Sequence, residues 1–375
     1  MNRRDFLSAA TATGVLGSRQ WAPAGASLTD ASSPLRSAGA ADWSRAPAID
    51  SLVNGGPYFE VDAVIEAGMT GAIVDMSMYP RSFNNAIQAL AGWNAAFRRN
   101  PKLLKVTRGD DLRAAEGAKR FAIVLACQDA AILDASTVSV MRSNIDLLGV
   151  FFDLGLRVLQ LTHNERNAVG DSFREKVDAG LSRLGEEVVP AMNELGMLID
   201  LSHCSRLTTL QAARLSSKPV AITHAGCRAL HPSARNKTDE EIRAVAEKGG
   251  YFGVFNMSLW LTERQTTSID DLLAHVDHAV KVAGIDHVGF GSDGPIVSSD
   301  VPPDQELAGY RAAYERNQGL PGAEAVPHHV TVRALNTPRR LDLLAHGLAR
   351  RGYGEAAVEK IIGGNIARVL REVLP

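Results

Sequence analysis

The stretch Met197-Leu198-Ile199-Asp200-Leu201-Ser202-His203 decides the fold class, because it is a short apolar run that ends in a histidine. A second run of the same kind, Pro219-Val220-Ala221-Ile222-Thr223-His224, follows it along the chain. Short apolar runs bounded by polar residues are typical of buried strands. When such strands alternate with helices, the residues that follow them gather at one edge of a parallel sheet. The two histidines are therefore expected at the same rim, one strand apart.

Eight runs of this kind are spread over residues 44–375, and longer segments with helical spacing separate them. Amphipathic spacing predicts helices from Leu181 to Leu195 and from Asp239 to Lys248, the second capped by Thr238. This number of strand–helix units predicts a single-domain α/β fold, a (β/α)8 TIM barrel. A doubly wound sheet is the competing architecture, but no glycine-rich phosphate loop follows the first strand. The predicted strands are 48–53, 71–77, 121–126, 157–162, 197–202, 219–223, 251–256 and 287–292.

The composition favours a small molecule as the partner. The chain has 375 residues, of which 45% are hydrophobic, so it is long enough to bury the core of a barrel. Its 40 basic and 42 acidic residues give a net charge of −2, which offers no electrostatic basis for binding nucleic acid. The three cysteines lack the number and spacing of a disulfide framework and are expected to be buried thiols.

The N-terminus is similar to a twin-arginine export signal. Arg3-Arg4-Asp5-Phe6-Leu7 precedes a modest apolar stretch that ends in small residues, with cleavage expected after Ala24 or Ala26. Residues 1–26 are therefore predicted to be a signal peptide, and the Ser/Ala/Asp/Pro-rich residues 27–43 a linker. The mature protein is expected in the periplasm after passage through the twin-arginine export machinery, with an uncleaved inner-membrane anchor as the alternative.

Polar residues follow six of the predicted strands and point to a metal site at the rim. A lone histidine at a strand end is usually structural, but neighbouring histidines such as His203 and His224 favour a metal. Asp293 lies among glycines after the last strand and is a candidate third ligand or general base, with capping of a turn as the alternative. The six residues are Asn54, Gln128, His163, His203, His224 and Asp293.

From about Ala48 onward the chain resembles the membrane (renal-type) dipeptidase family. The most specific similarity runs from Gly180 through the first histidine-bearing stretch to His224, and continues in Ala234-Arg235-Asn236. Leu161-Thr162-His163-Asn164 is similar to the family's fourth-strand motif, and the segments around Arg351 and Gly363 resemble its closing helices.

The resemblance implies a barrel enzyme that hydrolyses dipeptides with two zinc ions, and homodimers are common in the family. By motif position, His203 and His224 would bind the second zinc. His163 would polarise a substrate carbonyl, Arg235 would hold a substrate carboxylate, and Asp293 would handle the proton.

Three positions depart from the family pattern, and all three concern the first zinc. Leu52 and Asn54 stand where the family has a His-x-Asp pair, and Gln128 stands where it has a bridging Glu. Two dications about 4 Å apart repel by on the order of 17 kcal/mol at an effective dielectric near 20, and anionic ligands normally offset this. Without them the two-zinc site is not expected to form, and one zinc is predicted. Asp129 is an unlikely substitute, since neighbouring residues on a strand point oppositely.

The sequence thus predicts an exported metallohydrolase that cleaves dipeptides or a similar small amide with one metal. A non-catalytic member that binds a small ligand in the same pocket is the alternative. A different chemistry on the same barrel is a third, weaker hypothesis.

Overall fold

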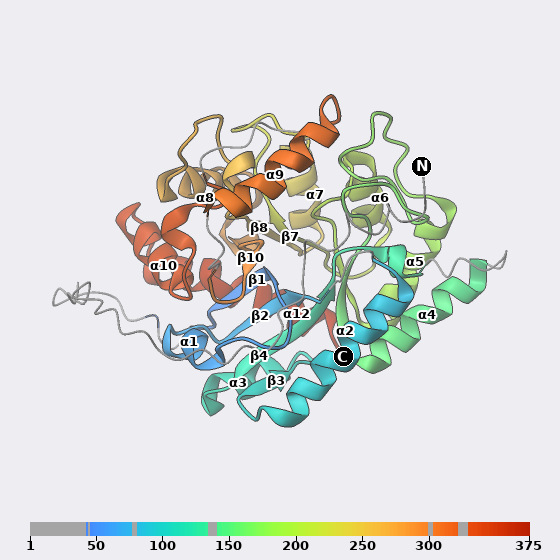
Figure 1. Ribbon diagram of the computed structural model, residues 1–375, viewed down its shortest axis with the longest axis horizontal. Coiled ribbons are helices and arrows are strands. Elements are labelled where there is room, and N and C mark those ends of the chain that lie inside the picture. The colour runs from blue at the N-terminus through green and yellow to red at the C-terminus, as the bar shows by residue number, and fades with distance from the viewer. Residues whose placement is uncertain (1–42, 44–45, 77–80, 134–140, 299–302, 322–328) are drawn as a thin grey trace. The chain divides into compact units, whose positions relative to one another are not determined.

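The computed structural model describes residue 43 and residues 46–76, 81–133, 141–298, 303–321 and 329–375 (Figure 1). The predicted signal peptide and all but Trp43 of the predicted linker lie outside these residues. Residues 42–375 form one compact unit. Within the part of the chain that is described, no helix combines the length and apolar character needed to cross a membrane.

All eight predicted strands are present, within a few residues of the expected bounds. Two further strands were missed, because segments of three and two residues are too short to show a periodic pattern: β3 (Leu103–Lys105) and β10 (Gly294–Pro295). The eight are β1 (Ile49–Asn54), β2 (Gly71–Asp75), β4 (Phe121–Cys127), β5 (Leu156–Gln160), β6 (Leu198–Asp200), β7 (Ala221–Ala225), β8 (Tyr251–Val254) and β9 (Val288–Phe290).

The strands pair in parallel in one curled sheet, whose order is β10-β1-β2-β4-β5-β6-β7-β8-β9. Strand β3 lies off this path and pairs with β4. At the two ends of the path, β10 pairs with β1 and β9 pairs with β8. Only residues 291–293 separate β9 from β10 in the chain, so one short segment links the two ends of the path.

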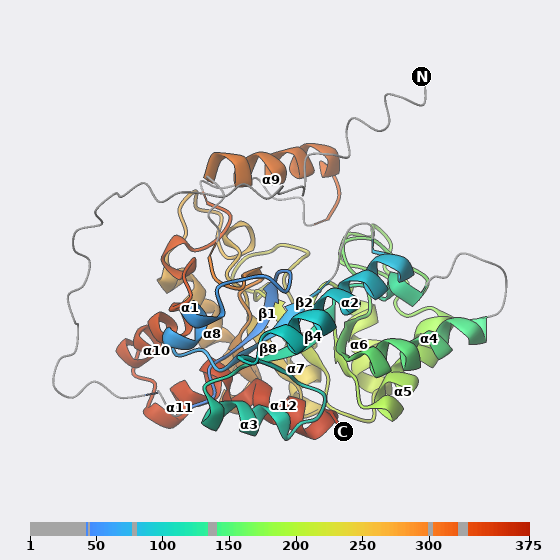
Figure 2. The ribbon, with the colours of Figure 1, turned by 60° about the horizontal axis from the view of Figure 1, so that its bottom comes forward.

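Helices connect the strands, as expected for parallel pairing (Figures 1 and 2). The two helices predicted from amphipathic spacing are confirmed, and so is the Thr238 cap, which forms a capping box with Glu241. The first helix has a cap that was not predicted, Ser182, which accepts from the Gly185 amide. The α-helices are α1 (Val61–Glu66), α2 (Phe83–Arg99), α3 (Asp111–Ala118), α4 (Met141–Leu154), α5 (Arg183–Leu195), α6 (Arg206–Leu215), α7 (Asp239–Glu247), α8 (Ile269–Ala283), α9 (Pro303–Asn317), α10 (Arg340–Arg350), α11 (Glu355–Glu359) and α12 (Asn365–Val373).

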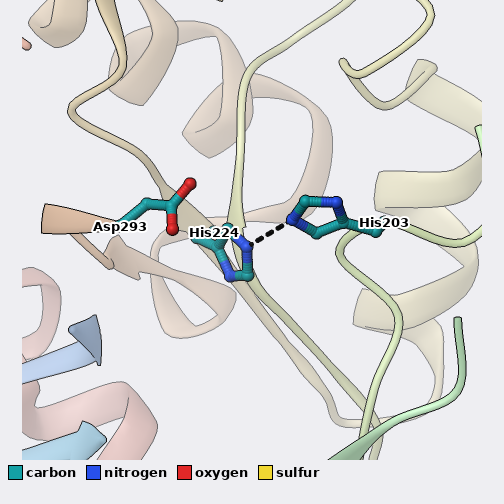
Figure 3. Close-up of side chains that lie close together, drawn as sticks. All are labelled: His203, His224 and Asp293. Atoms are coloured by element: carbon teal, nitrogen blue, oxygen red, sulfur yellow. Dashed lines mark hydrogen bonds between the residues drawn. The ribbon is translucent and has the colours of Figure 1, made fainter. Parts of the chain in front are cut away.

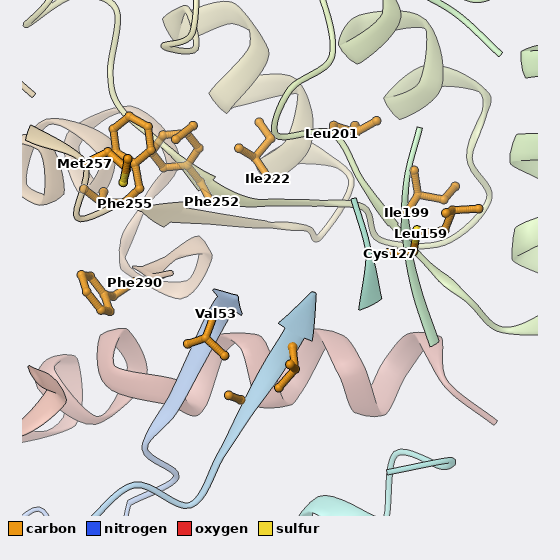
Figure 4. Packing of buried hydrophobic residues seen from close by; sticks show 14 of the residues in the cluster. Val53, Cys127, Leu159, Ile199, Leu201, Ile222, Phe252, Phe255, Met257 and Phe290 are labelled. Atoms are coloured by element: carbon orange, nitrogen blue, oxygen red, sulfur yellow. The ribbon is translucent and has the colours of Figure 1, made fainter. Parts of the chain in front are cut away.

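Both faces of the sheet are buried, so the strands are mainly apolar. On one face, side chains such as Val53 and Phe290 pack in a large cluster with the connecting helices (Figure 4). On the other face, Leu52 and Val124 belong to a second cluster that includes residues of α12. The alternation of neighbours between the clusters follows the two-residue repeat of a strand. The three cysteines are buried and free, as predicted.

Arg340 joins the first strand to the segment that follows the last one. Its guanidinium is 1% exposed and pairs with the buried Asp50 of β1 at 3.4 Å. It also donates to the Ser292 hydroxyl at 2.9 Å and to the carbonyl of Pro295 at 2.8 Å. Burial raises the pKa of Asp50, and Arg340 opposes that shift. One side chain therefore joins β1 to the segment that follows β9.

Replacing Arg340 by Met is expected to lower the free energy of unfolding by about 3–5 kcal/mol, because Asp50 is left buried without its cation. Urea titration followed by circular dichroism measures this. Arg339→Met is the control: Arg339 is exposed and pairs with Asp342 at the surface, so a change within about 0.5 kcal/mol is expected. Equal losses in the two variants would contradict the assignment.

Candidate functional site

Polar residues at the carboxyl ends of the strands surround one cavity of about 580 Å³. Its size lies within the range of small-molecule sites. Of the six polar residues predicted from strand ends, five line the cavity: Asn54, Gln128, His163, His203 and Asp293. The sixth, His224, is fully buried and touches the cavity residue His203.

His203, His224 and Asp293 form the only group in the described part of the chain with three His, Cys, Asp or Glu ligand atoms within metal-binding reach. These atoms lie within 4.8 Å of one another (Figure 3). The Nε2 atoms of the two histidines are 3.0 Å apart. Two imidazoles and a carboxylate form the donor set of a three-ligand catalytic zinc site.

The hydrogen bonds around His224 fix its tautomer. Asp200 accepts from two backbone N–H groups and from the hydroxyls of Ser202 and Thr223, the last at 2.6 Å. Because the Thr223 hydroxyl gives its proton to Asp200, its oxygen must accept from His224 Nδ1 at 2.8 Å. The Nε2 atom of a neutral His224 therefore carries a lone pair.

His203 is held in the same way. Its Nδ1 lies 3.1 Å from the Oδ1 atom of Asn164, an acceptor, so Nδ1 carries the proton. Burial lowers the pKa of both histidines well below the usual value, and Arg235 lowers it further. Both rings are therefore neutral near pH 7, with two Nε2 lone pairs directed at each other. A cation between them would turn this repulsion into attraction, so the residues fit a metal ion.

Asp293 reaches the cluster through an unusual backbone conformation. Its φ is 54°, in the left-handed region that Asp adopts more readily than most residues. The preceding Gly291 permits a close approach of the chain, since a Cβ atom there would lie 2.2 Å from the Thr223 carbonyl oxygen. Withdrawal from water raises the pKa of Asp293 to about 6, although Arg235 and the Asn54 amide oppose the shift.

Leu52, Asn54 and Gln128, the three positions predicted to lack first-zinc ligands, form no second ligand group in the described part of the chain. The Gln128 amide donates to Asn54 Oδ1 and Asp75 Oδ2, both at 3.1 Å. The Asn54 amide in turn donates to Asp293, to Oδ1 at 3.1 Å and to the carbonyl at 2.9 Å. Leu52 is 0% exposed within the second apolar cluster. A neutral chain of amides thus links the carboxylates of Asp75 and Asp293.

His163 has a fixed tautomer as well. Arg81 donates from Nη1 to His163 Nδ1 at 3.0 Å, and a guanidinium cannot accept a hydrogen bond. The proton of a neutral His163 is therefore on Nε2. Burial lowers the pKa of His163 well below its usual value, with Arg81 as a further cause, so the ring stays neutral near pH 7. Its ring stacks on His203 with centroids 4.2 Å apart.

Arg235 lies behind the cavity rather than on its wall. Its side chain is 0% exposed, and it donates to the carbonyls of Ser202 and His224, both at 2.9 Å. The rings of Phe173, Phe255 and Trp260 surround the guanidinium at 5.2–5.8 Å. Direct contact of Arg235 with a substrate stays a prediction. In this structure it holds together the two segments that carry His203 and His224.

Sequence reasoning missed three charged residues of the cavity: Asp75, Arg81 and Arg174. Asp75 is the last residue of β2, whereas the predicted strand ran on to residue 77. With the correct end, the rule that strand ends carry functional groups would have pointed to Asp75. Asp75 and Arg81 pair at 3.5 Å with side chains 5% and 6% exposed. Arg81 lies beyond the strand, where no short-range pattern marks it.

A curled parallel α/β sheet with a His/His/Asp cluster at its carboxyl end defines an amidohydrolase-like protein with a candidate metal centre. The sequence pattern of the membrane dipeptidase family (peptidase family M19) matches residues 61–301. The chain belongs to this family, which confirms the resemblance seen in the sequence. It is a family of metallo-dipeptidases.

Individual relatives agree with this assignment. An amidohydrolase from Pseudomonas aeruginosa is 26% identical with a TM-score of 0.76, and the match covers 88% of this chain and 97% of that one. A structure of the dipeptidase AC, a metallopeptidase, shares the fold at 18% identity and a TM-score of 0.70, covering 88% and 99% of the two chains. Dipeptidase tcpJ from Claviceps purpurea is 29% identical over 248 residues, 65% of this chain and 51% of its own length. The chain thus spans about half the length of the curated relatives it matches.

Gln128→Glu tests the amide chain. It removes both amide donors and places a third carboxylate beside Asp75, so we expect the metal-free protein to lose about 1–3 kcal/mol of unfolding free energy. Chemical denaturation with a chelator present measures it. Gln88→Glu on the exposed face of α2 is the matched control and should change little. A Gln128 variant as stable as the wild type would show that the chain of amides does not constrain the site.

Proposed function

We propose that the protein is a hydrolase that cleaves dipeptides, or a similar small amide, with a single zinc ion. The observation that carries this proposal is the convergence of His203, His224 and Asp293 with both Nε2 lone pairs directed inward. Membership of a dipeptidase family gives the class of substrate. Asn54, Gln128 and Leu52 support one ion rather than two, since none of them supplies an anionic ligand.

His203, His224 and Asp293 would hold the ion. A zinc ion supplies Lewis acidity to a carbonyl and lowers the pKa of water. Where the two histidines alone hold the ion, the carboxylate of Asp293 is placed to accept a proton from water instead of completing the ligand set. His163 Nε2–H is a donor for the oxygen of the scissile carbonyl, where negative charge develops during hydrolysis. Arg81 is a positioning residue, because it fixes the tautomer of His163.

Arg235 is proposed to have two roles, one toward the histidines and one toward the substrate. Its two donated hydrogen bonds hold the backbone next to His203 and His224. We retain the proposal that it attracts the carboxylate of a substrate, since a buried guanidinium acts over several ångströms in a low-dielectric site.

The alternative function is binding of a small ligand without hydrolysis. The amide chain from Asp75 to Asp293 favours it, because amides replace charged groups while preserving the shape of the cavity. A protein that binds zinc and dipeptides but turns over none of them would match this alternative.

The finer architecture and the location are also proposals. We interpret the curled sheet as a closed (β/α)8 barrel, supported by the pairing of β10 with β1 and of β9 with β8. Export to the periplasm rests on the twin-arginine pattern near the N-terminus alone.

Metal analysis tests the proposed site. Purified protein is expected to bind one zinc per chain, and His203→Ala or His224→Ala should lose both the zinc and hydrolysis of a dipeptide panel. His278→Ala serves as the control, because His278 pairs with Asp239 away from the cavity. Two tightly bound zinc ions would contradict the single-ion proposal. Zinc-loaded protein that cleaves no dipeptide would contradict the hydrolase proposal.

Arg81→Met is expected to reduce kcat about 10- to 100-fold, as is usual when a residue that orients a functional histidine is lost. The zinc content should stay near that of the wild type, because Arg81 donates to His163, which is not one of the three candidate ligands. Arg81→Lys restores a cationic donor and should recover part of kcat. Steady-state kinetics with metal analysis separates the effects, and loss of zinc in the Met variant would overturn the positioning role.

A further inference from the structure

Helix α9 presents a narrow aromatic stripe to the cavity. Most of the helix is polar, but Tyr310, Ala313, Tyr314 and Asn317 all line the cavity. Their spacing places them on one face of the helix. Leu307 and Tyr310 pack against the main hydrophobic cluster and anchor the helix. Tyr314, one turn further along, is partly exposed at the cavity.

A second apolar element completes this wall. Met257, Leu259 and Trp260 follow β8 and line the same cavity. Met257 and Leu259 are 2% and 6% exposed, and Trp260 stacks on Phe255 at a centroid distance of 5.8 Å. These side chains are held by the core, so the wall is a rigid surface against which an apolar group gains contact without ordering the protein.

The order of the strands places one part of this wall across the cavity from Arg81. Met257, Leu259 and Trp260 follow β8, whereas Arg81 follows β2, and strands β6 and β7 with His203 and His224 lie between β5 and β8. Helix α9 follows β10 and reaches over the cavity toward Arg174, because its residue Asn317 lines a second cavity together with Arg174. A molecule whose reacting bond lies at the histidines therefore meets an apolar surface after β8 and under α9, with the cation of Arg81 across the cavity from β8.

We propose that the wall formed by Tyr310, Tyr314 and Trp260 selects a substrate with a bulky apolar side chain, aromatic in preference, beside the bond that is cleaved. This deepens the proposed hydrolase function and rests on it. The family match ends at residue 301, before α9 begins. Figure 2 shows α9 lying over one end of the sheet, on the side of the cavity.

The test compares phenylalanyl-alanine with alanyl-alanine. For the wild type we expect kcat/KM to favour the aromatic dipeptide at least about tenfold, the range that filling an apolar pocket gives. Tyr314→Ala should bring the ratio close to one, and Tyr314→Phe, which keeps the ring, should preserve it. Arg311→Ala on the exposed face of α9 is the control and should leave the ratio unchanged.

Binding of uncleavable phosphinate analogues of the same two dipeptides, measured by calorimetry, separates this inference from the proposed function. Tighter binding of the aromatic analogue that disappears in Tyr314→Ala supports the wall even if neither dipeptide is cleaved. Hydrolysis of both dipeptides with equal kcat/KM in the wild type overturns the inference and leaves the hydrolase proposal standing. A preference that survives in Tyr314→Ala also overturns it, with circular dichroism confirming that the variants are folded.

Discussion

Two neutral imidazoles whose Nε2 lone pairs face each other at 3.0 Å are the constraint on which the site depends. The arrangement is unfavourable by itself, and the surrounding structure enforces it. Asp200 acts through Thr223 on one ring and Asn164 acts on the other, so neither ring can turn its proton inward without losing a hydrogen bond. Arg235 fixes the backbone of both segments from behind. Most of this network is buried, where an unmet polar group is costly.

The sequence predicted the parts of this arrangement that follow from position along a strand. His203 follows β6 and His224 lies near the end of β7. Parallel strands bring their carboxyl ends to one edge, so the proximity of the two histidines needed no knowledge of distant contacts. Arg81 and Tyr314 belong to segments beyond the strands, and their place in the cavity depends on how those segments fold back over the sheet. Arg235 shows a further limit: its residue type indicated anion binding, but only the tertiary structure reveals that its donors reach two backbone carbonyls.

The side of the cavity without a candidate metal centre is held together by hydrogen bonds and an ion pair. Gln128 and Asn54 connect two carboxylates by donated hydrogen bonds, and Arg81 neutralises Asp75. Charges that a metal would otherwise balance are balanced here by a guanidinium and by amide dipoles. The cavity therefore combines a candidate metal centre on the side of β6 and β7 with an ion pair on the side of β2. This division gives a bound molecule a defined direction.

Leu52 has a consequence for how the site could be changed. It fills a fully buried position in the second apolar cluster, two residues before Asn54 on the same face of β1. A histidine placed at this position alone would bury an imidazole among aliphatic side chains, with no ion beside it to offset the cost. The packing of β1 therefore opposes the acquisition of a further metal ligand here by a single substitution.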